Sequence, residues 1–65
     1  VLNDIALRLG DDAAEVRYAA AVVLAGYGAQ ARPALPNLRA CLEDPVEKVA
    51  QCAAGAIKLI ELPRP

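Results

Sequence analysis

The amino-acid sequence predicts an all-α protein made of two stacked helical hairpins that form a segment of an α-solenoid. Three observations predict this fold class. Apolar residues recur at helical spacing, turn-forming residues separate the apolar runs, and the whole pattern repeats after 33 residues. We expect one segment, 1–65, with a first unit at about 1–28 and a second unit at about 33–61.

The composition favours closely packed helices with a thin core. The 65 residues are 57% hydrophobic, but they include fifteen Ala and no Phe, Trp or Met. Alanine favours the helix and lets backbones approach closely, yet it buries little apolar area. Because a compact core of this size is marginal and repeat proteins usually need about three units, we expect the chain to be a fragment of a longer array.

The repeat aligns apolar anchors and turn-forming aspartates rather than every residue. Of the 32 pairs of residues that lie 33 positions apart, six are identical. They are Leu2/Leu35, Leu9/Leu42, Asp11/Asp44, Val16/Val49, Ala20/Ala53 and Ala21/Ala54. Periods of 20–50 residues indicate repeats that bury their apolar faces against their neighbours.

The first unit reads as two helices on either side of a turn. Gly10 breaks the first helix, and Asp11 is expected to be the N-cap of the second, because its carboxylate can accept free backbone N–H groups. The second helix is expected to run to about Ala25 or Gly26 and to end at "GYG". The inner face of the first helix is Leu2, Ile5, Ala6 and Leu9, and that of the second is Val16, Ala20, Val23, Leu24 and Tyr27.

The second unit follows a link, "GAQAR". Pro33 and Pro36 fit the start of a helix, since proline lacks the N–H that an interior turn needs. The inner stripe of that helix is expected to be Leu35, Leu38 and Leu42.

The stretch "DPVE" predicts the start of the last helix. Asp44 is expected as the N-cap, Pro45 as the first helical residue and Glu47 as the partner in a capping box. The helix would then run from Pro45 to about Glu61 and be stopped by Pro63 and Pro65.

The stretches "LGDDAAEVRYAAAVVL" and "GAQARPALPNL" carry a resemblance to a known family. Their order of Leu, Asp, Val-Arg, paired Ala, Leu, Gly and Pro resembles the HEAT repeat, in its short bacterial, phycobilisome-lyase-type form. The resemblance covers nearly the whole chain and implies a right-handed superhelix. It also implies that Arg17 pairs with a cap aspartate, Asp11 or Asp44; the alternative is a solvated Arg17 whose stem covers apolar surface.

The second unit departs from that pattern, because Ala50 stands where the family usually has Arg. Two other repeats of similar length fit less well. Ankyrin units have a T-P-L-H-x-A signature that is missing here, and tetratricopeptide units need more aromatic residues than Tyr18 and Tyr27.

No catalytic constellation, cofactor site or metal site is evident. The sequence contains no His, Ser or Thr, which leaves few groups for general base or nucleophilic chemistry. We expect Cys52 to be a buried thiol and Cys41 to be partly exposed; a disulfide between them remains an alternative. The sequence does not identify a compartment, and a cytoplasmic location is the default expectation.

The candidate binding site is a surface on the second helix of each unit. In the HEAT family this side lines the concave face. It would carry Tyr18, Val22, Glu47, Gln51 and Lys58, with Asp11, Asp44 and Arg17 as structural cap and ladder residues. An exposed Tyr is a typical interface anchor, although single apolar residues are also normal on surfaces.

We therefore expect a non-catalytic protein–protein interaction or scaffolding module that binds a protein or peptide. Two alternatives stay open: a self-associating repeat fragment, and an accessory module of a lyase-type enzyme. A net charge of −1 with scattered basic residues argues against nucleic acid, and no apolar run is long enough to cross a membrane.

Overall fold

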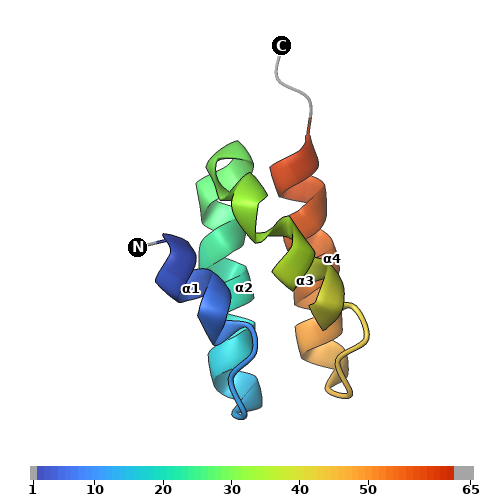
Figure 1. Cartoon of the computed structure of the whole chain (residues 1–65). Coiled ribbons are helices and arrows are strands. Elements are labelled where there is room, and N and C mark those ends of the chain that lie inside the picture. The colour runs from blue at the N-terminus through green and yellow to red at the C-terminus, as the bar shows by residue number, and fades with distance from the viewer. Residues whose placement is uncertain (1, 63–65) are drawn as a thin grey trace.

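The computed structural model describes residues 2–62, and this part of the chain is helical and contains no strand (Figure 1). The elements are α1 (Leu2–Arg8), α2 (Ala14–Tyr27), the 3₁₀ helix η1 (Gly28–Ala34), α3 (Leu35–Cys41) and α4 (Glu47–Glu61). The predicted all-α class is confirmed. The expected stop at Pro63 and Pro65 lies outside the described residues.

The helices form two layers, with α1 and α3 in front of α2 and α4 in Figure 1. The main packing is that of α2 along α4, and α3 packs on α4 while α1 packs on α2. Each short front helix runs antiparallel to the longer helix that follows it, and η1 carries the chain from α2 to the front layer. The molecule measures 36 × 23 × 16 Å along its principal axes.

The 33-residue period recurs in the backbone. The bounds of α3 are those of α1 advanced by 33 residues, and α4 begins 33 residues after α2. The turns also match: the Leu9 N–H donates to the Ala6 carbonyl at 3.2 Å, and the Leu42 N–H donates to the Arg39 carbonyl at 3.1 Å.

The expected N-caps are wrong by two residues. The helices α2 and α4 are capped by Ala13 and Val46, whose backbones are extended. The two aspartates instead form Asx turns just before these residues, because a short carboxylate readily accepts the N–H two positions on. Asp11 Oδ1 accepts from the Ala13 N–H at 2.9 Å, and Asp44 Oδ1 accepts from the Val46 N–H at 2.8 Å.

This shift also overturns the expected capping box. Pro45 lies in the Asx turn, outside the helix, where its missing N–H costs no hydrogen bond. Glu47 is the first residue of α4, so it does not reach back over the cap. Its carboxylate instead accepts from the Gln51 side-chain amide at 3.4 Å, four residues along the same helix.

The link between the hairpins is more ordered and more buried than "GAQAR" suggests. It forms η1, and Pro33 lies inside this 3₁₀ helix rather than at the start of an α-helix. Pro36 occupies the expected position in the first turn of α3. Two link residues, Ala31 and Ala34, are buried in the core, which the loop assignment did not predict.

The core is thin, as the composition indicates. Seven of the thirteen buried apolar residues in the described part of the chain are Ala, and the largest fully buried side chains are Leu24, Leu38, Val49 and Ile60. Two residues assigned to the inner faces are exposed instead. Val23 is 45% exposed on α2, and Leu42, which follows α3, is 44% exposed. Tyr27 is partly buried against the core.

Candidate protein interface

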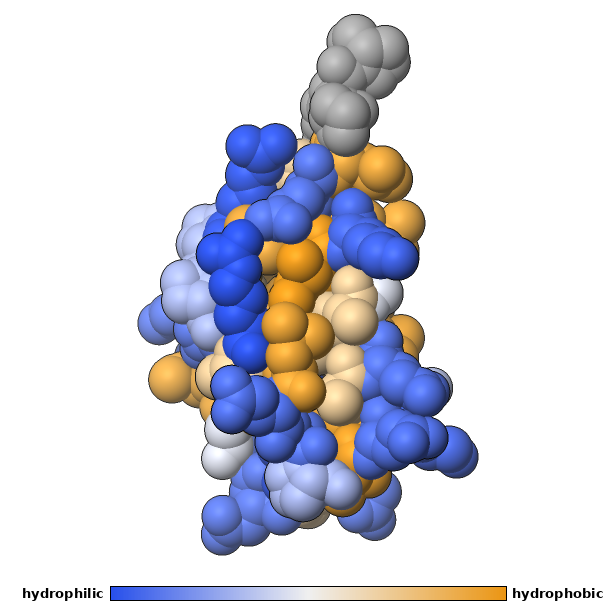
Figure 2. Space-filling view, turned by 90° about the vertical axis from the view of Figure 1, so that its right-hand side faces the viewer, coloured by the Kyte–Doolittle hydropathy of each residue, from blue (hydrophilic) through white to orange (hydrophobic). Residues whose placement is uncertain are grey.

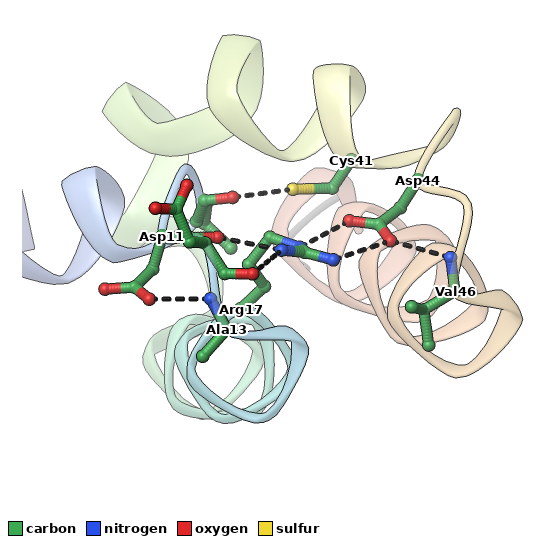
Figure 3. A network of polar contacts seen from close by, with 8 residues as sticks. Asp11, Ala13, Arg17, Cys41, Asp44 and Val46 are labelled. Atoms are coloured by element: carbon green, nitrogen blue, oxygen red, sulfur yellow. Dashed lines mark hydrogen bonds and ion pairs between the residues drawn. The ribbon is translucent and has the colours of Figure 1, made fainter.

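The two hairpins are joined by a polar network centred on Arg17 (Figure 3). Arg17 lies in the first turns of α2, and its guanidinium binds the Asp44 carboxylate from the turn before α4 through Nε at 2.6 Å and Nη2 at 3.1 Å. Its Nη1 donates to the carbonyls of Asp11 at 2.8 Å and Asp12 at 3.0 Å. Arg17 therefore bridges the turn of its own hairpin and the turn of the next.

The network is largely shielded from solvent. The side chains of Arg17 and Asp44 are 15% and 6% exposed. The Arg17 guanidinium, helped by the Val46 N–H, holds the pKa of Asp44 below its usual value, while hydrogen bonding to Asp44 raises the pKa of Arg17. Both charges are thus stabilised in the folded chain. Asp11 takes part through its backbone, since its carboxylate binds only the Ala13 N–H among the described contacts.

The two thiols are free, and their environments are the reverse of those expected. Cys41 is buried, and its Sγ contacts the Leu9 carbonyl at 3.5 Å across the hairpin boundary. The prediction that Cys41 is partly exposed is therefore wrong. Cys52 is only partly buried. Burial raises the pKa of both thiols, and the nearby Asp44 carboxylate raises that of Cys41 further.

An open depression runs beside Tyr18 on the surface between α2 and α4. One part, of about 300 Å³, is lined by Ala14, Glu15, Tyr18, Val46, Lys48 and Val49. A second part adjoins it and is lined by Tyr18, Lys48, Gln51 and Cys52. Tyr18 is 44% exposed and lines both parts. An aromatic side chain with apolar neighbours and a nearby cation can bind a peptide side chain by burial and by charge.

The structure brings together only part of the predicted surface set. Tyr18 and Gln51 line the depression. Val22, Glu47 and Lys58 are exposed on α2 and α4, but none of them lines either part.

Sequence reasoning missed Val46, Lys48 and Cys52. It compared residues 33 positions apart, which pairs Tyr18 with Gln51. Helical side chains lean toward the N-terminus of their helix, so Tyr18 reaches the α4 turn that contains Lys48. A correction of one turn to the 33-residue offset would have found Lys48.

Other site classes gain no support within residues 2–62. No group of three or more Cys, Asp or Glu side chains in this range is arranged to hold a metal ion. None of the helices in the same range is long and apolar enough to span a membrane.

Comparisons of this chain with models of protein families, with curated proteins and with solved structures give no match.

Proposed function

We propose that this chain is a non-catalytic protein–protein interaction module, a HEAT-like stack of two helical hairpins that binds a protein or peptide beside Tyr18. The solenoid reading is supported by the 33-residue offset between α1 and α3 and by the matching turns. It is also supported by the Arg17–Asp44 pair, the contact that the resemblance implies between neighbouring units.

One observation carries the proposed function: Tyr18 is exposed and lines two open depressions at the α2–α4 boundary. A tyrosine ring offers a large rigid contact area at a low cost in side-chain entropy, and interfaces are enriched in such anchors. The neighbouring backbone is helical and the helices are packed on each other, so the surface is preformed.

The lining defines the chemistry of a partner. The exposed Val46 gives an apolar contact beside Tyr18, and Lys48 supplies a positive charge that adjoins both depressions. We expect a peptide segment with an apolar side chain against Tyr18 and Val46 and a carboxylate within reach of Lys48.

A displayed library of random peptides, selected on the intact chain, tests the proposal. Binding of the selected peptides is then measured by isothermal titration calorimetry on the Tyr18→Ala and Val23→Ala variants. We expect Tyr18→Ala to weaken binding at least about tenfold, as for an interface anchor. Val23 is a matched control, because it has the same exposure on α2 but lies outside both depressions.

The Lys48→Ala variant tests the charge, and Lys58→Ala controls for it on the same helix outside the depression. Equal affinity of Tyr18→Ala and wild type for every selected peptide would refute the site, and so would a library that yields no binder.

A further inference from the structure

The outer side of the second hairpin presents a face that the first hairpin buries. In the first hairpin, three residues at the shared core are at most 3% exposed: Leu9, Ala21 and Leu24. Their counterparts 33 positions on are Leu42, which is 44% exposed, Ala54, which is exposed, and Ile57, which is partly buried. We call Leu42, Ala50, Ala54 and Ile57 the C-face. Figure 2 shows an apolar stripe between hydrophilic side chains on this side of the molecule.

The outer side of the first hairpin presents the complementary face. In the second hairpin, Leu38, Val49 and Ala56 are at most 1% exposed in the shared core. Their counterparts are Ile5, Val16 and Val23, which line an open depression of about 220 Å³ together with Arg8, Ala19 and Ala20. We call its four exposed or partly exposed apolar residues, Ile5, Val16, Ala19 and Val23, the N-face. The apolar positions at the two ends of the molecule thus repeat those on the two sides of its internal junction.

Of the ion pair at the junction, the ends of the molecule carry the aspartate but not the arginine. Asp11 forms the same Asx turn as Asp44, but within residues 2–62 no cation forms an ion pair with its carboxylate. Arg17 supplies that cation to Asp44, and its counterpart on the C-face is Ala50. If a second copy stacked on the C-face, its Asp11 would lie where Asp44 lies in the internal junction. The residue facing it would be Ala50 instead of an arginine.

A second polar contact of the junction has no equivalent at the ends. Inside the molecule, the Asn37 side-chain amide donates to the Ala6 carbonyl at 3.1 Å. The counterparts of these two residues are Asp4 on the first hairpin and Arg39 on the second. An ionised Asp4 has no N–H to donate to the Arg39 carbonyl, and the Arg39 guanidinium already pairs with Glu61 at 2.6 Å. The match between the ends therefore rests on their apolar positions.

We propose that a second copy of this chain stacks head to tail on the first, its N-face against the C-face. Both apolar faces then become buried in the manner of the internal junction, and the absence of an arginine at position 50 keeps the association weak. Because the contact joins two different faces, it does not close on itself and adds copies in a row. Both faces lie outside the Tyr18 depression. The experiments on stacking therefore test this inference independently of the proposed function.

The Ala50→Arg variant supplies the missing cation and is the first test. Ala50 is partly exposed on α4, and Arg is a good helix former, so the substitution fits the fold. Sedimentation equilibrium should show association strengthened about tenfold or more over wild type, as expected for a charge-assisted bidentate pair. Adding Asp11→Asn should cancel that gain, whereas adding Asp12→Asn, one residue away, should not. Equal association constants for Ala50→Arg and wild type would overturn the proposal.

Blocking each face separately tests the polarity of the contact. In the Ala50→Arg background, Val23→Glu blocks the N-face and Ala54→Glu blocks the C-face, and both sites are exposed enough to accept the charge. Each variant alone should be a monomer, because its remaining face has no complement. Their mixture should form a 1:1 dimer that does not grow.

Two results contradict this scheme. A variant that dimerises alone would show a symmetric contact between like faces. Monomers in every sample, the mixture included, would show that the faces bind something other than a second copy. Circular dichroism on the same samples verifies that each variant keeps its helices.

Discussion

Asp44 is the residue on which most of the junction depends. Its carboxylate holds the turn before α4 through the Val46 N–H and also accepts the Arg17 fork from the other hairpin. The sequence analysis identified Asp44 as a structural residue, and the resemblance implied Asp11 or Asp44 as the partner of Arg17. The two-residue shift of the helix start was not predictable, because aspartate favours both an Asx turn and an N-cap. The backbone angles of Val46 decide between these two roles for Asp44.

The lowered pKa of Asp44 makes stability depend on pH. In the unfolded chain this carboxyl titrates at about pH 3.9, whereas Arg17 keeps it ionised to lower pH in the folded chain. Its contribution is therefore present above about pH 4 and is lost as the pH falls through the folded-state pKa.

Urea unfolding between pH 2 and 6 measures this contribution. Wild type should lose stability on acidification more steeply than Asp44→Asn, which can still accept from the Val46 N–H but carries no charge. Parallel stability curves for the two proteins would contradict the assignment.

At the scale of elements, the connection between the hairpins depends on Gly28. This residue ends α2 with φ 60° and ψ −137°, a backbone conformation available essentially to glycine alone. The chain then turns into η1 and places Ala31 and Ala34 in the core. The sequence predicted a helix end at "GYG", and Gly28 is the glycine that makes the turn. Nothing in "GAQAR" by itself indicated that the link would be buried.

Two glycine substitutions should therefore have opposite effects. Gly28→Ala should lower the free energy of unfolding by about 1–3 kcal/mol, the usual cost of forcing a side chain into such a conformation. Gly55→Ala should raise it by about 0.5–1 kcal/mol, because Gly55 lies inside α4 and an added Cβ meets nothing within 4 Å. Chemical denaturation of both variants measures whether the free energy of unfolding falls in Gly28→Ala and rises in Gly55→Ala. A loss of stability in Gly55→Ala would show that the α4 backbone needs glycine for a reason other than space.

At the scale of the whole molecule, periodicity predicted more than composition did. The 33-residue offset anticipated that the helix bounds repeat along the chain. It did not predict every residue of α4 that lies beside Tyr18, because the direction of a side chain is not part of a comparison of aligned positions. The Tyr18 depression therefore includes Lys48, which the sequence comparison left out.

The two hairpins should unfold as one cooperative unit. They share one core, and Arg17 and Asp44 join them, so neither buries its apolar face alone. In the Cys52→Ala variant, Cys41 is the single thiol and lies buried at the junction. Its pulsed alkylation in urea should give the same midpoint as circular dichroism. Alkylation at lower urea than the loss of helix would indicate that the junction opens first.

The contacts from α3 to α1 bear on how the chain folds during its synthesis. The Ala6 carbonyl in α1 is bound by the Asn37 side chain, and the Leu9 carbonyl just after it by Cys41. A helix of seven residues has little stability of its own. On the ribosome, α1 and α2 emerge before either of these donors exists. The first hairpin therefore gains these two contacts only after α3 has emerged, and an interrupted translation product that ends before Asn37 would expose the apolar side of α2 to the chaperones and proteases of the cell.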